Sequence, residues 1–89
     1  MISKSMKIVN ELGLHARAAA KVVSIANEFE SNIILKKDNK NADAKSIMKI
    51  LMLSASKGAS VEIIVDGSDQ NKAMNAVVKL FKNGFDEGL

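Results

Sequence analysis

The sequence predicts an α+β fold, an open-faced β-sandwich in which three helices cover one face of a mainly antiparallel, four-stranded sheet. Segments with a two-residue hydrophobic period alternate with segments of helical period, which gives the element order β-α-β-β-α-β-α. The chain has 89 residues and contains no repeats or linker-like tracts. We therefore expect a single domain over residues 1–89.

Four segments have the pattern of half-buried or buried strands. They lie at residues 5–8, 32–36, 40–43 and 60–66. The first alternates Met6 and Ile8 with polar neighbours, the second is mostly β-branched, and the third follows a polar turn. The last alternates most regularly and places Val61, Ile63 and Val65 on one face. Each strand can therefore bury one apolar face.

Three segments have the pattern of amphipathic helices. They lie at residues 16–29, at 46–53 with Ser46 as N-cap, and between an N-cap at Ser68 or Asp69 and a terminating glycine, Gly84. The residues expected to face the core are Ala19, Val22, Val23, Ala26 and Phe29 in the first helix, and Ala73, Ala76, Val77, Leu80 and Phe81 in the last.

The composition excludes several kinds of site. The chain has no cysteine, and its only histidine and only arginine are His15 and Arg17. A disulfide, a catalytic triad, or a metal site of several histidines or cysteines cannot be assembled from it, and we expect no cofactor and no metal.

The net charge of +3 is spread along the chain, and the only aromatic residues are three phenylalanines. A nucleic-acid partner is therefore not expected. No apolar stretch approaches the ~18 residues of a membrane span, and the first residues lack the hydrophobic run of a secretion signal. We expect a cytoplasmic protein, and nothing in the sequence requires more than a monomer.

His15 and Arg17 stand together where a turn at Gly13 meets the first helix. The first N–H groups of a helix are unpaired and its N-terminus is positive, so this position suits an anion. A neutral imidazole is a good nucleophile, and a phosphoryl group on it would meet the N–H groups of Ala16 and Arg17 and the Arg17 guanidinium. The alternative is that His15 is only an N-cap or a surface residue and Arg17 a solvated side chain.

Two blocks of sequence resemble the HPr family, the histidine-containing phosphocarriers of the bacterial phosphotransferase system. Residues 13–20, Gly-Leu-His-Ala-Arg-Ala-Ala-Ala, are similar to the family's active-site motif. Residues 45–51, Lys-Ser-Ile-Met-Lys-Ile-Leu, are similar to the block that holds its regulatory serine and docking helix. Length and element order agree, so the resemblance covers essentially the whole chain.

The resemblance implies a phosphoryl relay. His15 would accept a phosphoryl group on Nδ1 from phosphorylated enzyme I, itself charged by phosphoenolpyruvate, and pass it to sugar-specific enzyme IIA components, while Arg17 steadies the phosphate. The chain would be an intermediate in phosphoryl transfer and not an independent enzyme. One nucleophile, one guanidinium and a helix N-terminus suffice, because such transfer mainly requires positioning and charge neutralisation.

The chain also departs from the family pattern. Ala18 stands where the family often has proline, and Ser24 and Asn27 stand where basic residues are common. These differences leave open a second function, a regulatory HPr-like binding module that phosphorylation at His15 or Ser46 controls in place of sugar transport. Its partners would be the HPr kinase/phosphorylase or a transcriptional regulator.

Ser46 and the helix after it have both a structural and a functional interpretation. Serine is a favoured N-cap, and the same residue would be the regulatory phosphorylation site. The helix is too apolar for one buried stripe. It is either wholly buried or, as the resemblance implies, turns Ile50 and Leu53 inward and exposes a docking surface. That surface would consist of Ala20, Lys45, Ile47, Met48, Lys49 and Leu51, whose lysines would steer acidic partners.

Overall fold

The computed structural model describes residues 1–87. It contains four strands and three helices in the predicted order. These are β1 (Ile2–Lys7), α1 (Ala16–Ala26), β2 (Asn32–Lys37), β3 (Lys40–Asp43), α2 (Ile47–Leu51), β4 (Ser60–Asp66) and α3 (Gln70–Lys82).

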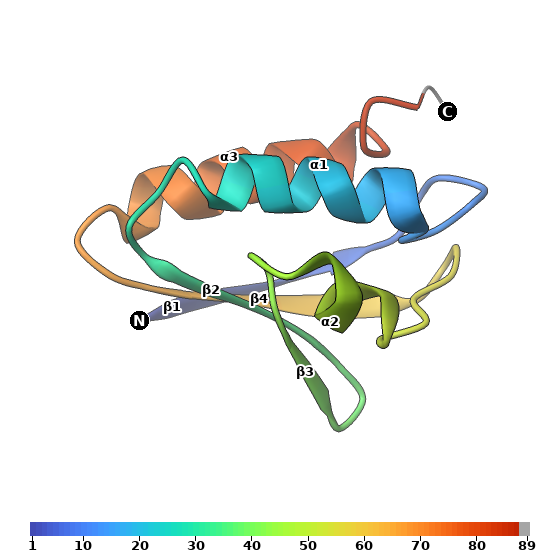
Figure 1. The fold of residues 1–89 in the computed structure, drawn as a ribbon, viewed down its shortest axis with the longest axis horizontal. Helices are drawn as coiled ribbons and strands as arrows, with labels where there is room; N and C mark the ends of the chain where they lie inside the picture. Colours follow the sequence, from blue (N-terminus) through green and yellow to red (C-terminus); the bar gives the residue numbers. More distant parts are fainter. Residues whose placement is uncertain (88–89) are drawn as a thin grey trace.

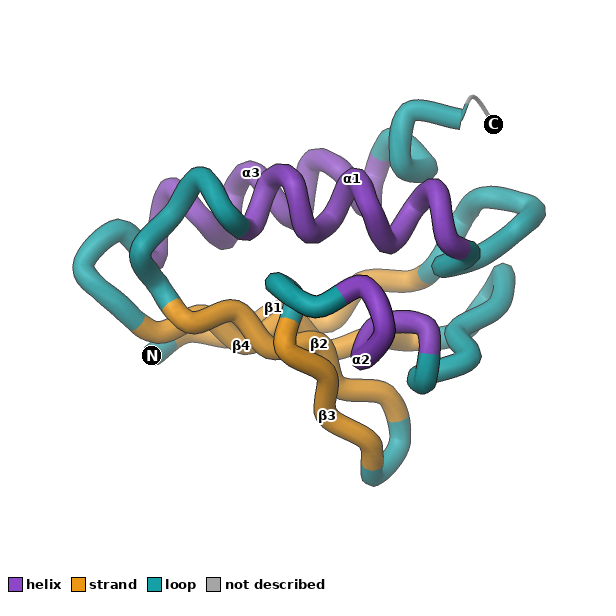
Figure 2. Tube along the Cα trace, viewed as in Figure 1, coloured by secondary structure: helices purple, strands orange, loops and turns teal. Residues whose placement is uncertain are grey.

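The strands form one antiparallel sheet in the order β1-β4-β2-β3. All three helices lie on the same face of this sheet, with α1 and α3 side by side and α2 beneath the first half of α1 (Figures 1 and 2). The predicted open-faced α+β sandwich is confirmed. Pairing of Met6 with Val61 and of Leu35 with Ile63 aligns the apolar positions of neighbouring strands on the helix-covered face.

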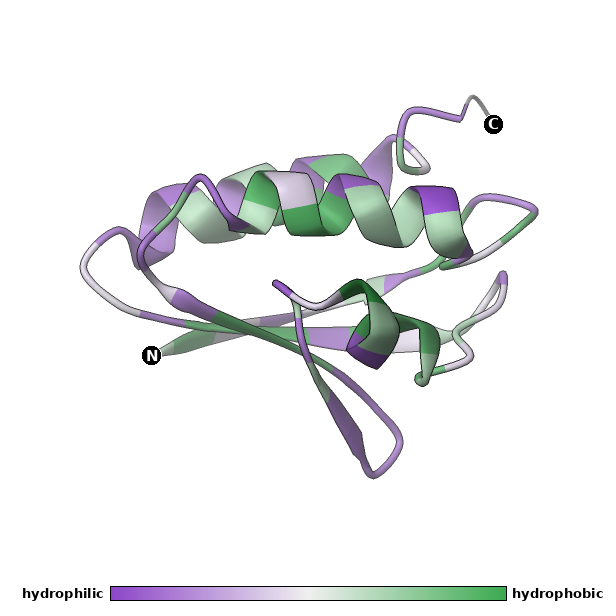
Figure 3. Ribbon diagram, in the orientation of Figure 1, coloured by the Kyte–Doolittle hydropathy of each residue, from purple (hydrophilic) through white to green (hydrophobic). Residues whose placement is uncertain are grey.

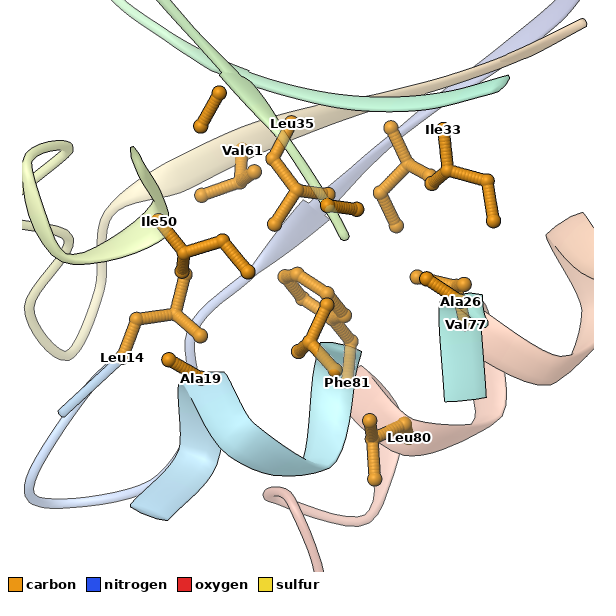
Figure 4. Close-up of a cluster of buried hydrophobic side chains, with 14 of the residues drawn as sticks. Leu14, Ala19, Ala26, Ile33, Leu35, Ile50, Val61, Val77, Leu80 and Phe81 are labelled. Atoms are coloured by element: carbon orange, nitrogen blue, oxygen red, sulfur yellow. The ribbon is translucent and has the colours of Figure 1, made fainter. Parts of the chain in front are cut away.

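The core lies between this face and the helices. In Figure 3 the hydrophobic residues of α1 turn toward the sheet. Phe81 of α3 is fully buried between residues of the sheet and of α1, as Figure 4 shows. Alanines at 18, 19 and 26 are also fully buried, so α1 can approach its neighbours closely.

Helix α1 is shorter than the periodicity predicts, ending at Ala26 with Asn27 as C-cap. The N–H groups of Glu28 and Phe29 bond to carbonyls three residues back, which tightens the last turn. Asp69 then accepts hydrogen bonds from the N–H groups of Glu30 and Ser31. The helix ends early because Asp69, nearly 40 positions away, accepts hydrogen bonds from the backbone that follows it.

The N-cap of α3 also differs from the prediction. Asp69 occupies the N-cap position, but its side chain makes no capping bond. Its carboxylate is used by the Ser31 hydroxyl and by the two N–H groups of the α1–β2 turn. It therefore joins two loops instead of closing its own helix.

Three boundaries or positions needed correction. Strand β1 runs over Ile2–Lys7 and not 5–8, because its whole length pairs with β4; Ile8 is buried just beyond it. Helix α2 ends at Leu51, and the chain continues through two tight turns. Ala76 is only half-buried, although the pattern places it in the core.

A histidine at the start of helix α1

The turn before His15 is held against a second loop of the protein. Gly13 has φ +66° and donates its N–H to the Asn10 carbonyl at 3.3 Å. Leu14 donates to the Ala55 carbonyl at 2.9 Å, and its side chain is buried. The backbone that leads into α1 is therefore anchored one residue before His15.

His15 is the N-cap of α1. Its Nδ1 accepts the Arg17 N–H at 3.3 Å, and its carbonyl accepts the Ala19 N–H at 2.8 Å. The imidazole is 24% exposed, and both Ala16 and Arg17 are exposed. The N-cap interpretation is confirmed, and the geometry is compatible with a reactive site, because Nδ1 is directed at the Arg17 N–H in the first helical turn.

Two residues that the sequence pattern did not indicate complete this site. The Nε2 of His15 pairs with Oε2 of Glu87, 72 positions later. The Nδ2 of Asn10 donates to Glu87 Oε1 at 2.8 Å and to the Gly13 carbonyl at 2.9 Å. Asn10 is 1% exposed, and its Oδ1 is buried without a hydrogen-bond partner among residues 1–87.

The segment after α3 brings Glu87 to the site. Gly84, Phe85 and Asp86 all have φ near +60°, and they turn the chain back over the start of α1 (Figure 1). Phe85 is fully buried and packs edge-on against Phe81 with ring centroids 4.9 Å apart. A buried aromatic residue therefore fixes the segment two residues before Glu87.

Hydrogen bonds keep Glu87 ionised. The bond from Asn10 is the largest cause that lowers the pKa of the Glu87 carboxyl below its usual value. The hydrogen bond with His15 and the charges of His15 and Arg17 lower this pKa further, while partial burial opposes them. The site thus combines a histidine, a nearby guanidinium and an ionised carboxylate.

Comparison with known proteins identifies the family of the chain. The sequence profile described as "PTS HPr component phosphorylation site" matches residues 2–83. The chain belongs to the HPr family. It is 42% identical over 88 residues to the phosphocarrier protein HPr of Cupriavidus necator, a match that covers 99% of both proteins.

Solved structures of HPr proteins from Thermoanaerobacter tengcongensis have the same fold. One, crystallised as HPr-C-His, is 43% identical with a TM-score of 0.95 and full coverage of both chains. Another, crystallised as an HPr dimer, is 42% identical with a TM-score of 0.76, covering 96% of this chain and 98% of the other. The matches extend over the whole fold and not only over the histidine motif.

In this HPr-family chain, Ser46 is the N-cap of α2, and its Oγ accepts the Lys49 N–H at 3.3 Å. Its side chain is half-buried. Lys45 donates from Nζ to the Phe29 carbonyl at 2.9 Å, so its ammonium group is held against the turn between α1 and β2. Lys49 is exposed and is the freer of the two lysines.

The predicted division of the apolar helix is largely confirmed. Ile50 and Leu53 are buried, whereas Met48 is 71% exposed and Ile47 39%. Leu51 differs, because it is partly buried against the core. Ala20 is exposed on α1, which packs against α2. Leu12 and Met52 are further exposed apolar residues that the predicted surface did not include.

Within residues 1–87, no group of three or more His, Asp or Glu side chains is placed to hold a metal ion. No helix in the same range is both long and apolar enough to cross a membrane.

Proposed function

We propose that this chain is a phosphocarrier. Nδ1 of His15 accepts the phosphoryl group of phosphorylated enzyme I and delivers it to sugar-specific enzyme IIA proteins. The observation that carries the proposal is the N-cap geometry of His15, with Nδ1 directed at the first turn of α1 and the ring partly exposed. Membership of the HPr family supports it.

The chemistry requires no other catalytic group. The lone pair of Nδ1 forms a bond to phosphorus as the bond between phosphorus and the donor atom of enzyme I breaks and leaves its electron pair on that atom. The N–H groups of Ala16 and Arg17 and the Arg17 guanidinium would receive the phosphoryl oxygens. The Arg17 N–H would exchange its bond to Nδ1 for one to the phosphate.

The test is labelling with phosphoenolpyruvate and enzyme I, followed by mass spectrometry of the intact chain. We expect one acid-labile phosphate on the wild-type chain and none on a folded His15→Ala variant. Arg17→Lys keeps the charge but loses the planar fork, so we expect about a tenfold lower rate, equivalent to ~1.4 kcal/mol. Absence of acid-labile phosphate from the wild-type chain would refute the proposal.

A regulatory function is the second candidate, and the position of Ser46 favours it. Its hydroxyl lies at the edge of α2 with an exposed lysine close by, and its capping bond is long. A phosphoryl group there would bring a charge of nearly −2 to the proposed docking surface and hinder an acidic partner. The partner would be the HPr kinase/phosphorylase or a transcriptional regulator.

This candidate is distinguished by the phosphate donor. Acid-stable phosphate that appears only with ATP and a kinase, and that is lost in Ser46→Ala, would support regulation. A chain that takes phosphate from the kinase but never from enzyme I would replace the carrier proposal. A chain phosphorylated by both would combine the two functions.

The proposed docking surface consists of Ala20, Lys45, Ile47, Met48, Lys49 and Leu51. Ile47 and Met48 are exposed on α2, which packs against α1. We expect Lys49→Gln to raise the KM for phosphorylated enzyme I a few-fold at low salt and to leave kcat unchanged. Lys72→Gln on α3 makes the same charge change elsewhere and is the matched control; equal effects would refute steering by this surface.

The partner classes follow from the same reasoning. We propose a cytoplasmic monomer without nucleic-acid or membrane partners and without a cofactor. Retention on DNA or RNA that persists at physiological salt would contradict the first exclusion. Light scattering over a range of concentrations tests the monomer, since a relative from T. tengcongensis has been crystallised as a dimer.

A further inference from the structure

We propose that Glu87 and Asn10 form a positioning pair for His15. The pair keeps the ring proton on Nε2, so that Nδ1 is free to react, and offsets the positive charge of the ring once Nδ1 carries a phosphoryl group. This inference rests on the phosphocarrier function proposed above.

The hydrogen bonds fix the orientation of each member. Both protons of the Asn10 amide go to groups that can only accept, the Gly13 carbonyl at 2.9 Å and Glu87 Oε1 at 2.8 Å. Asn10 therefore cannot be turned over without losing both bonds. With Oε1 occupied, Oε2 is the oxygen that Glu87 presents to His15.

The same logic assigns the tautomer of the ring. An ionised carboxylate only accepts hydrogen bonds, so Nε2 must be the donor to Glu87. On the other side of the ring, Nδ1 accepts the Arg17 N–H at 3.3 Å. Both contacts favour one neutral form, with the proton on Nε2 and a lone pair on Nδ1.

The path of the chain shows that Glu87 is held in place. Phe85 and Asp86 have φ of +58° and +63°, a left-handed conformation that is uncommon outside glycine. Phe85 is fully buried, and the Asp86 N–H bonds to Asn83 Oδ1 at 3.0 Å. Glu87 itself is only 12% exposed and donates its N–H to the Gly84 carbonyl. This segment adopts a strained turn that places one carboxylate at Nε2.

The pair has a defined role in the transfer. When Nδ1 bonds to phosphorus, no proton needs to leave the ring, and a ring that is substituted on both nitrogens carries a positive charge. Glu87 faces that charge at Nε2 and keeps the proton there. The protonated ring is the better leaving group when the P–N bond breaks toward the acceptor. Loss of the Nε2 proton would instead leave an anionic leaving group.

The experiment compares Glu87→Gln with Asp86→Asn. Both variants remove one carboxylate from the same segment, but Asp86 is exposed and faces Lys21 Nζ at 3.9 Å. Asparagine also tolerates the left-handed backbone at position 86. Another variant at the site, Asn10→Ala, removes the donor that orients Glu87. It is measured in the same assays once circular dichroism shows that it is folded.

The first measurement is ¹⁵N NMR of the His15 ring in the unphosphorylated chain. We expect a proton on Nε2 that exchanges slowly with water in the wild-type chain and in Asp86→Asn, and at least fivefold faster exchange in Glu87→Gln. The second is phosphoryl transfer with enzyme I. Glu87→Gln should lower kcat about tenfold, a change of ~1.4 kcal/mol, with KM within twofold. As pH rises, Glu87→Gln should also stop transferring at a lower pH than the wild-type chain, because no carboxylate holds the Nε2 proton of the phosphorylated ring.

A merely structural contact would lower stability without changing the pH profile. The inference is overturned if Glu87→Gln matches Asp86→Asn in Nε2 exchange, in kcat and in pH profile. If the wild-type chain takes no phosphate from enzyme I, the phosphocarrier function fails and the NMR measurement is decisive. In that case a slowly exchanging Nε2 proton that depends on Glu87 supports the positioning contact, and its absence overturns it.

Discussion

Gly13 supports both the fold and the site, and replacing it with alanine tests that connection. Its φ of +66° is costly for any residue with a Cβ, by about 1–2 kcal/mol. A Cβ at this position would lie 2.5 Å from the Ala55 carbonyl oxygen and 2.9 Å from Ser56 Cα. Both are backbone atoms and cannot move aside as a flexible side chain would.

The same Ala55 carbonyl accepts the Leu14 N–H at 2.9 Å. Separating the loops enough for a Cβ would weaken this hydrogen bond, at a cost of about 0.5–1.5 kcal/mol. Together, strain and lost bonding predict that Gly13→Ala lowers the free energy of unfolding by about 1.5–3.5 kcal/mol. That is a large part of the stability of a small domain, typically ~5–15 kcal/mol.

Gly58→Ala is the matched control. Gly58 also has a positive φ, of +90°, but a Cβ there meets no atom within 4 Å. It should cost only the strain, about 1–2 kcal/mol. Urea unfolding of the two variants measures the difference. Equal losses, or a larger loss for Gly58→Ala, would refute the argument from close approach.

Gly13→Ala should also slow phosphoryl transfer under conditions where the variant is folded, because His15 lies two residues further on. Gly58→Ala should not slow it. A folded Gly13→Ala chain that transfers at the wild-type rate would show that the turn contributes to stability alone.

Three further predictions concern stability. Hydrogen bonds from the Ser31 hydroxyl and, next in size, the Glu30 N–H hold the pKa of Asp69 below the 3.8 of an ordinary aspartate. The ionised carboxylate therefore stabilises the fold at pH values above the unfolded-state pKa. This contribution is lost as pH falls through the lower pKa of the folded state. The acid limb of a pH-stability curve should therefore flatten in Asp69→Asn but not in Asp38→Asn, which changes an exposed aspartate. In urea unfolding, Ser46→Ala should lower the free energy of unfolding by about 1 kcal/mol, whereas Ser46→Asp should lower it much less, since aspartate also caps a helix. Equal losses in the two variants would exclude a capping contribution. Ala18→Pro should raise the free energy of unfolding by up to about 1 kcal/mol, and with it the melting temperature, because Ala18 lies in the first turn of α1, where no intrahelical bond needs its N–H. A lower melting temperature would mean that this buried position cannot accommodate the proline ring.

Local patterns were sufficient for most of the fold. Strand β4 agrees with the predicted 60–66 because its alternation reflects a single buried face, and Gly84 lies at the predicted end of α3 with a left-handed φ. The end of α1 could not be predicted in this way. Its apolar pattern continues to Phe29, but Asp69 accepts hydrogen bonds from the next two backbone N–H groups. Local propensity cannot indicate a partner so far along the chain.

The candidate site also contains residues that local sequence features indicate and residues that only distant contacts bring in. His15 and Arg17 were indicated by their rarity and by their position at a turn-to-helix junction, which are local features. Asn10 and Glu87 were not indicated, because their role depends on three left-handed residues that bring the end of α3 back to α1. Phe85, an apolar residue just past a helix-ending glycine, was the one local signal that this segment is anchored to the core.

On the phosphocarrier proposal, the two nitrogens of the His15 ring would have separate tasks. A carrier must leave its reactive atom accessible and yet hold the ring in one orientation before and after transfer. Phosphorylation at Nδ1 would break only the bond from the Arg17 N–H, whereas the contact between Nε2 and Glu87 would remain. On the proposal above, the ring is therefore anchored from the side that does not react. Because Glu87 is fixed by Asn10 and by the core through Phe85, this anchor does not depend on either partner, so donor and acceptor would meet the same ring geometry.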